Sequence, residues 1–260
     1  MWQQTIIACV LFMTIWAFLW FSLAQLIKRN DIADIAWGLG FIAACLVTSY
    51  TATGEVLPQT LPGILVLSFV LIWGLRLSFH IFMRNRGKKE DYRYQQWRKE
   101  WGIWFLPRSF AQVFLLQAYL AIIVVSPALA VLQNTNAETT LLVGVGSLVW
   151  LFGFLFEAVA DAQLKDFLSR KKSPDQIITA GLWKYSRHPN YFGEITQWWG
   201  IYILAVGAVG AWAAILGPAA ITFLITKVSG IPLLEKKMIQ NPKYVAYAKK
   251  TSVLVPWFVK

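Results

Sequence analysis

Charged residues are scarce in this sequence. Only 14% of its 260 residues are charged, whereas 57% are hydrophobic. A soluble domain averages about 25% charged and about 45–50% apolar residues. So few charges cannot cover a water-facing surface of ordinary size. The composition therefore excludes an ordinary soluble enzyme, a disordered chain and a nucleic-acid-binding protein of the usual kind.

Cysteine and histidine are also rare. The two cysteines, Cys9 and Cys45, both fall in apolar stretches, and the two histidines are His80 and His188. Such a small set predicts neither a disulfide framework nor a metal site. The glycines at 144 and 146 lack the third glycine of a dinucleotide-binding fingerprint, so a Rossmann fold is not expected.

Long apolar runs fill most of the chain. A transmembrane helix needs about 20 mostly apolar residues. Seven stretches meet this requirement: 2–27, 33–51, 61–83, 109–132, 139–162, 190–208 and 211–229. We therefore predict an all-α fold, a polytopic integral membrane bundle of about seven helices that forms a single domain over residues 1–260.

The 24 basic residues outnumber the 13 acidic ones and give a net charge of +11. With seven spans, every lysine and arginine in a loop falls on one side, and only Arg76 lies inside a span. The loops 52–60 and 133–138, on the other side, contain none. Because basic loops stay in the cytoplasm, we predict the N-terminus outside and the C-terminus inside. A six-span arrangement would split the basic loops between both faces.

Three predicted helices carry polar residues four apart near their cytoplasmic ends, which places them on one helix face. Charged side chains inside a membrane turn toward the protein interior. We therefore expect a polar cavity, open to the cytoplasm and lined by charges of both signs. The alternative is a set of interhelical ion pairs, for example Arg76 with Asp34. The residues are Glu157, Asp161 and Lys165; Arg76, His80 and Arg84; and Asn190 and Glu194.

The segment before the sixth predicted span has the features of an anion site. Pro189 suits the first position of a helix, so the N–H groups of residues 190–192 are expected to be free at the helix start. Arg187 and His188 precede them and add donors for an anionic group such as a phosphate. The alternative is a capped helix that begins at the membrane surface.

The sequence of residues 181–194, Gly-Leu-Trp-Lys-Tyr-Ser-Arg-His-Pro-Asn-Tyr-Phe-Gly-Glu, resembles the C-terminal signature of the steroid 5-alpha-reductase family. Further segments resemble a less characterised bacterial branch of that family, so that the resemblance covers nearly the whole chain. They are residues 30–41, 85–94 and 229–237, together with Tyr244, Tyr247, Pro256 and Trp257.

The resemblance implies one of two cofactors. Steroid and sterol reductases use NADPH, whereas related isoprenylcysteine and phospholipid methyltransferases use S-adenosylmethionine with a similar Arg-His-Pro-x-Tyr segment. The Asn-Tyr-Phe-Gly-Glu form favours the reductases, and so does the basic run 170–172, because phosphates bind arginine and lysine. The expected cofactor-binding residues lie in the half from about 139 to 260: Asn190, Glu194, Asp161, Lys165, Tyr185, Arg187, His188 and Tyr191.

The substrate side departs from the family pattern. Steroid reductases hold the substrate ketone with a glutamate and a tyrosine on early helices, but the tyrosine position falls near Gly74, and the nearest acid is Asp34. Reduction of an enone needs a hydrogen-bond donor at its carbonyl oxygen. Tyr92, in the loop after the third span, is the candidate donor, with Asp34 and Arg76 as further catalytic candidates.

We therefore predict an NADPH-dependent membrane oxidoreductase that reduces a carbon–carbon double bond of a hydrophobic, steroid-like or lipid enone. NADPH would bind from the cytoplasm, and the substrate would enter from the bilayer, which is the inner membrane in a bacterium. The alternatives are an S-adenosylmethionine-dependent lipid or isoprenylcysteine-type methyltransferase and a non-enzymatic lipid-binding or transport protein. Membrane lipids are the expected partners, and no nucleic acid is expected.

Overall fold

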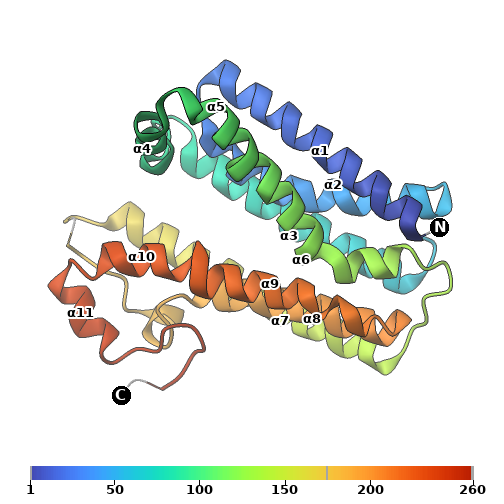
Figure 1. Ribbon diagram of the computed structural model, residues 1–260. Coiled ribbons are helices and arrows are strands. Elements are labelled where there is room, and N and C mark those ends of the chain that lie inside the picture. The colour runs from blue at the N-terminus through green and yellow to red at the C-terminus, as the bar shows by residue number, and fades with distance from the viewer. Residues whose placement is uncertain (1, 174, 259–260) are drawn as a thin grey trace. The chain divides into compact units, whose positions relative to one another are not determined.

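The computed structural model describes residues 2–173 and 175–258, and it is all-helical over these ranges (Figure 1). This confirms the predicted fold class of a polytopic helical membrane protein. Contacts between residues divide the chain into two compact units. The first contains residues 1–140 and 205–216, and the second contains residues 141–204 and 217–260. The expected single domain over the whole chain stays a prediction.

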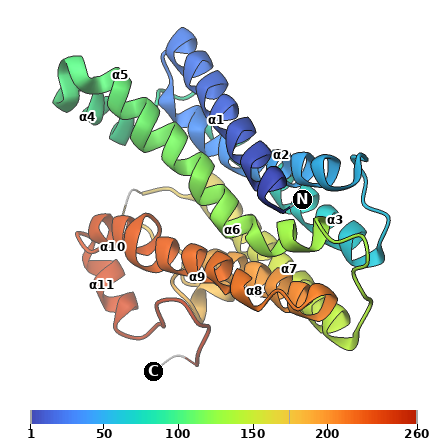
Figure 2. The same cartoon turned by 45° about the vertical axis from the view of Figure 1, so that its right-hand side comes forward.

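The first unit is built around four long helices, α1, α2, α3 and α6, and α2 packs against the other three (Figures 1 and 2). Shorter helical elements between α3 and α6 form a peripheral segment. The elements are α1 (Trp2–Ile27), η1 (Asn30–Ile32), α2 (Ala33–Thr53), α3 (Leu61–Asn85), α4 (Tyr92–Trp101), η2 (Gly102–Trp104), α5 (Phe105–Arg108), η3 (Ser109–Leu115), α6 (Leu116–Leu132) and η5 (Trp212–Ile215).

Local sequence explains where these helices begin and how two of them meet. The Thr60 hydroxyl accepts a hydrogen bond from the Gly63 N–H at 3.3 Å and so caps the start of α3. Further along, a Cβ atom at Gly38 of α2 would lie 2.7 Å from the Gly74 carbonyl oxygen of α3. The two backbones therefore touch, because small residues allow close approach of membrane helices. The Ser78 hydroxyl completes this contact by donating to the Ile35 carbonyl oxygen at 2.9 Å.

The second unit contains the paired helices α7 and α8 and a C-terminal segment of shorter elements. The elements are α7 (Leu141–Arg170), η4 (Gly181–Lys184), α8 (Pro189–Val209, of which residues 189–204 belong to this unit), α9 (Leu216–Phe223), η6 (Leu224–Val228), α10 (Ile231–Met238) and α11 (Pro242–Ala248). Asn241 caps α11, since its side-chain oxygen accepts the Lys243 N–H at 3.0 Å.

Glycines hold α7 and α8 in backbone contact at two levels. A Cβ atom at Gly153 of α7 would lie 2.7 Å from the Gly193 carbonyl oxygen of α8. Two turns away, a Cβ atom at Gly146 would lie 2.6 Å from the Gly200 carbonyl oxygen. Only residues without a side chain permit this distance, so the two helices are fixed in register along the unit.

Among the described residues, six helices are long and apolar enough to cross a membrane, against about seven predicted. The predicted span 190–208 does form a helix, α8, but it falls outside the six because polar residues lower its mean hydropathy. No residue of α8 is fully exposed. Its 21 residues extend over about 30 Å, the thickness of the hydrocarbon core of a bilayer. The seven-crossing topology therefore stays a prediction.

Candidate functional site

The start of α8 is held by the C-terminal segment of the chain. The Arg187 N–H donates to the Ser252 carbonyl oxygen at 2.8 Å. The fully buried Ser186 hydroxyl accepts the His188 N–H at 3.1 Å and donates to the Leu254 carbonyl oxygen at 2.7 Å. The segment that carries the predicted anion site is thus ordered by residues that lie more than 60 positions away in the sequence.

Glu235 of α10 binds three side chains at this helix start. One carboxylate oxygen, Oε2, accepts a hydrogen bond from Arg187 Nη1 at 2.9 Å. The other, Oε1, lies 2.9 Å from His188 Nε2 and accepts the Tyr244 hydroxyl at 2.6 Å. We call these four residues the Glu235 cluster. The Arg187 Nε atom is buried and has no hydrogen-bond partner among the described residues, so the guanidinium retains a donor for a further group.

The electrostatics of the Glu235 cluster keep two of its members neutral. Burial lowers the pKa of His188 from its usual 6.5, although the hydrogen bond to Glu235 acts in the opposite direction. The neutral imidazole therefore donates its Nε2 proton to the Glu235 carboxylate at pH 7. Burial and the same carboxylate raise the pKa of Tyr244, so its hydroxyl remains a donor.

A second pair joins α7 to the start of α8. The Asn190 side-chain amide donates to Asp161 Oδ1 at 3.2 Å. The structure thus brings together two residues that the sequence separates by 29 positions. Four more of the predicted cofactor residues lie nearby along the chain: Tyr191, whose ring stacks on His188 at 5.7 Å, half-buried Glu194, and the exposed Tyr185 and Lys165.

One turn deeper, α7 and α8 share another polar pair, at the level of the Gly153–Gly193 contact. The Gln197 amide nitrogen donates to Glu157 Oε2 at 2.5 Å, and both side chains are almost completely buried. Of the three predicted polar helix faces, those of α7 and α8 thus face each other within the second unit. The expectation that the Phe192 N–H is free at the helix start is wrong. This N–H donates to the His188 carbonyl oxygen at 3.1 Å and so closes the first helical turn.

The substrate-side candidates lie in the first unit. The Asp34 carboxylate accepts the Tyr94 hydroxyl at 3.3 Å, and Arg93 Nη2 lies 3.7 Å from its other oxygen. Tyr94 is only 3% exposed, whereas Tyr92, two residues earlier, is 59% exposed. Arg76 is half-buried on α3.

The loop between α3 and α4 is tied to the start of α2. The Asn30 N–H donates to Glu90 Oε1 at 2.7 Å, and Arg98 Nη2 lies 3.3 Å from the same oxygen. Arg29 forms an ion pair with Asp31 at 2.7 Å. Next to Arg93, burial alone would raise the pKa of Asp91, but hydrogen bonds from Arg93 outweigh burial and lower it. The loop is therefore fastened at several points.

Sequence reasoning missed Glu235, Tyr244 and the Asp34–Tyr94 pairing. Glu235 lies 48 positions after Arg187, and no periodicity links the two. Its signals in the sequence are its place in the segment 229–237, which resembles the family, and its isolation as an acid before Lys236 and Lys237. Tyr92 and Tyr94 lie in the segment predicted as a loop and both belong to α4 in the structure, so only the fold distinguishes their burial.

The all-helical fold, the Glu235 cluster and the polar pairs Asn190–Asp161 and Asp34–Tyr94 define a polytopic helical membrane protein with polar sites near helix ends. The sequence profile of the family described as "Protein of unknown function (DUF1295)" matches residues 20–251. The chain therefore belongs to this family, which is steroid 5-alpha-reductase-like. This confirms the resemblance seen in the sequence.

Two curated relatives extend the comparison. The chain is 29% identical to 3-oxo-5-alpha-steroid 4-dehydrogenase 1 of Bos taurus over 44% of this chain and 41% of that protein. It is 22% identical to an uncharacterized protein of Schizosaccharomyces pombe over 59% of this chain and 54% of that protein. The chain thus spans about half the length of these relatives. No solved structure matches it. The similarity suggests a membrane oxidoreductase.

Proposed function

We propose that the protein is an NADPH-dependent reductase of a carbon–carbon double bond in a hydrophobic, steroid-like or lipid enone, with a role in lipid metabolism. The observation that carries the proposal is the hydrogen bond between Asn190 and Asp161. Family resemblance selects both residues as cofactor ligands, and they meet at the start of α8. The name of the bovine relative supports a reductase over a methyltransferase.

The residues around this pair fit a dinucleotide. Arg187, three residues before Asn190, has a buried Nε–H without a partner in the described part of the chain, which suits a phosphate oxygen. The Asn190 amide and the carboxylates of Asp161 and Glu194 supply the acceptors and donors that a ribose or a carboxamide needs. NADPH supplies a hydride when it is bound. His188, kept neutral by burial, positions the Glu235 cluster without adding a charge.

Tyr94 and Asp34 are the candidates of the first unit for the proton-donating role. As hydride reaches the β-carbon of an enone, negative charge develops on the carbonyl oxygen and must be stabilised by a donor. A tyrosine hydroxyl can be such a donor. In the structure the Tyr94 hydroxyl donates to Asp34, so its proton must turn away from this carboxylate to reach a substrate. We name Tyr94 as the donor candidate, Asp34 as the residue that holds it before substrate binds, Arg76 as a candidate for holding the substrate and Tyr92 as the exposed tyrosine of the same helix.

Thermal unfolding of the purified protein with NADPH, NADH or S-adenosylmethionine tests the cofactor. We expect NADPH to raise Tm, and Asn190→Ala and Glu194→Ala to abolish the shift. Asn136→Ala, in an exposed loop, and Glu100→Ala, on an exposed helix face, are matched controls. A shift with S-adenosylmethionine alone would move the assignment to a methyltransferase, and no shift with NADPH at near-millimolar concentration would end the reductase proposal.

Turnover tests the proton donor separately. Loss of a positioned acid lowers rates by about 10²–10⁴-fold, so Tyr94→Phe should lower NADPH oxidation with an enone panel by that factor. Tyr92→Phe is the control on the same helix, α4, and should retain the rate. The reverse pattern would transfer the role to Tyr92.

A further inference from the structure

An exposed apolar turn lies in the first unit, between α4 and the predicted span 109–132. Ile103 and Trp104 of η2 are 91% and 58% exposed, and Leu106 of α5 is 53% exposed. The turn begins where α4 ends, at Gly102, whose φ of 50° lies in the left-handed region that favours glycine. Neighbouring large apolar side chains that are this exposed mark an interaction site. We call Ile103, Trp104 and Leu106 the apolar turn.

Basic side chains stand on both sides of the apolar turn. Residues 84–108 contain eight basic and three acidic residues, which is an excess of five positive charges. Lys88, Lys89 and Lys99 are exposed, and within the described part of the chain none of them forms an ion pair. Arg108 follows the turn directly and is exposed as well. The surface around the apolar turn therefore retains cations for an anionic partner.

The support beneath the apolar turn is well packed. Phe105 is 5% exposed, and the guanidinium carbon of Arg98 lies 4.1 Å from the centre of its ring. The rings of Trp97 and Trp101 stack at 5.1 Å. On the inner face of α4, Tyr94 packs edge-on against Trp97 at 5.3 Å and is buried. One face of this segment is thus fixed in the protein, while the turn projects outward.

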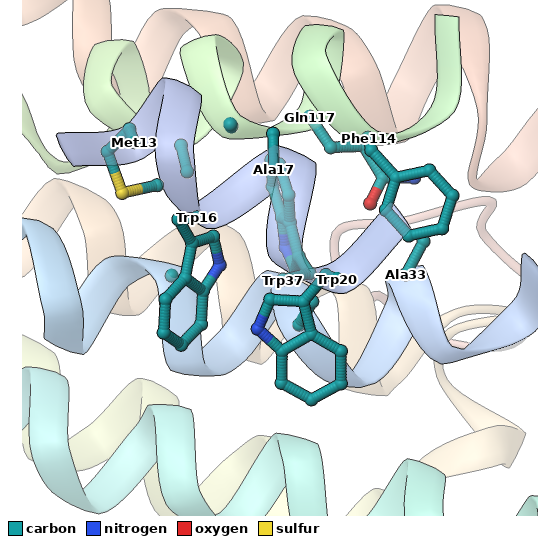
Figure 3. A pocket seen from close by; sticks show the side chains of 12 residues that line it. Met13, Trp16, Ala17, Trp20, Ala33, Trp37, Phe114 and Gln117 are labelled. Carbon is teal, nitrogen blue, oxygen red and sulfur yellow. The ribbon is translucent and has the colours of Figure 1, made fainter. Parts of the chain in front are cut away.

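The helix that follows the turn is fixed against α1. The ring of Phe21 lies 5.4 Å from Phe110 and 5.7 Å from Phe114, both of η3. Phe114 also lines a hollow between α1, α2 and the η3–α6 segment (Figure 3). This hollow encloses about 20 Å³, room for one or two water-sized groups, so the packing here is close. The Asn30 amide adds a hydrogen bond to the Ser109 hydroxyl at 2.8 Å.

The place of the turn in the chain selects its partner. It lies between α3 and α6, and both belong to stretches that are apolar enough to cross a membrane. Figures 1 and 2 show α4 and α5 at the end of the first unit away from the N-terminus. A segment that joins two spans lies at a membrane surface. The positive-inside rule accounts for cations there, but it does not account for an exposed apolar turn.

We propose that the apolar turn inserts into the adjoining membrane leaflet and that the lysines beside it bind the phosphates of anionic phospholipids. Apolar and aromatic side chains next to lysines are the composition of segments that lie in the membrane interface. Clustered lysines and arginines at a membrane surface attract anionic headgroups. A hydrophilic acidic partner would pair with the lysines but would leave Ile103 and Trp104 in water. A leaflet that contains anionic lipid satisfies both.

Fluorescence quenching in lipid nanodiscs tests the insertion on the full-length protein. Ile103→Cys is labelled with bimane, and the native protein, whose Cys9 and Cys45 are buried, gives the background. We expect a nitroxide on the lipid acyl chain to quench position 103 more strongly than iodide in the water does. Asn136→Cys, in an exposed loop, is the control and should show the reverse order.

Stronger quenching of position 103 by iodide would leave the turn to a soluble partner and overturn the proposal. Leu106→Cys is the second labelling position if Ile103→Cys does not fold.

Native mass spectrometry with equal amounts of phosphatidylglycerol and phosphatidylcholine tests the headgroup. We expect the protein to retain more phosphatidylglycerol. Each lysine at an anionic surface contributes about fivefold in affinity, so the double variant Lys88→Gln and Lys89→Gln should lower the retained phosphatidylglycerol by more than about tenfold. Lys249→Gln with Lys250→Gln removes the same charge from exposed positions of the C-terminal segment and should keep the preference.

Equal loss in the two double variants, or no preference in the native protein, would contradict the headgroup assignment. Both measurements require neither cofactor nor turnover, so their outcome is independent of the reductase proposal.

Discussion

The Glu235 carboxylate accepts contacts from Arg187, His188 and Tyr244, which come from two different parts of the chain. A carboxylate in such a position stabilises partly buried donors that would otherwise lose their hydration. The Arg187 side chain is 12% exposed, and that of Glu235 is 22% exposed. Removing the acceptor therefore leaves a largely buried guanidinium without its counter-charge, which is more costly than the loss of a surface ion pair.

We expect Glu235→Gln to lower the free energy of unfolding by about 2 kcal/mol and Tyr244→Phe by about 1 kcal/mol. Because the two residues share one hydrogen bond, the double variant should lose less than the sum. Denaturant titration in detergent measures these values, with Glu100→Gln on an exposed helix face as the control. Strict additivity would show that the cluster does not act as a unit.

The lowered pKa of His188 predicts a pH dependence of stability. Burial lowers this pKa below its usual 6.5, so the unfolded chain binds a proton at His188 more readily than the folded chain does. The stabilising effect is fully present above pH 6.5 and is lost as the pH falls from there toward the folded-state pKa. Tm should therefore fall between pH 7.5 and pH 5.5, and His188→Gln should reduce this fall.

The control for this prediction is a residue that does not titrate. Asn136→Ala, in an exposed loop, should leave the pH profile of Tm as it is in the native protein. Equal profiles for the native protein and His188→Gln would contradict the assignment of the pH dependence to His188.

Sequence alone brought Asn190 and Asp161 into one hypothesis through the family resemblance, which points to Asn190 within the motif 181–194 and to Asp161 one helix earlier. It did not pair Glu235 with Arg187 or Tyr94 with Asp34, since these contacts span 48 and 60 positions of the chain. A single sequence contains no signal for such pairings. It also cannot tell which of two neighbouring tyrosines is buried.

At the scale of helices, the backbone contact of α7 and α8 orders the cofactor residues. Gly193 lies between Asn190 and Gln197 on α8, and a Cβ atom there would stand 2.6 Å from the Glu157 N atom. Gly193→Ala should therefore force the helices apart and destabilise the protein by about 1–3 kcal/mol. Thermal unfolding measures this, and NADPH stabilisation should fall in parallel.

Gly144→Ala is the matched control on α7, since nothing lies within 4 Å of the added methyl group. It should leave Tm unchanged or raise it slightly, because alanine has the higher helix propensity. Equal destabilisation by the two variants would show that the close contact at Gly193 is not what orders the unit.

Helix positions were largely predictable, because long apolar runs are a strong signal. The runs 2–27 and 190–208 correspond to α1 (Trp2–Ile27) and α8 (Pro189–Val209). The π-helical turns η3 and η6 were not predictable, since one extra residue per turn leaves hydropathy unchanged.

At the scale of the whole molecule, α8 decides the topology. Its polar residues lower its hydropathy, yet they are buried or half-buried. A helix whose polar groups face protein can cross a bilayer, because lipid contacts only its apolar side. If α8 crosses, the basic loop after α3 and the basic C-terminal segment share one side, as the positive-inside rule requires. If it does not, these two segments lie on opposite sides.

Cysteine labelling distinguishes these arrangements. Lys88→Cys lies in the loop after α3, Lys250→Cys in the C-terminal segment and Asn136→Cys in the loop after α6, and the native Cys9 and Cys45 are buried. A membrane-impermeant maleimide added to intact cells should label only Asn136→Cys, whereas permeabilised cells should yield labelling of all three. Labelling of Lys250→Cys but not Lys88→Cys in intact cells would mean that α8 does not cross. Labelling of both Lys88→Cys and Lys250→Cys in intact cells would show an orientation opposite to the predicted one. It would contradict the prediction that loops rich in lysine and arginine lie on the cytoplasmic face.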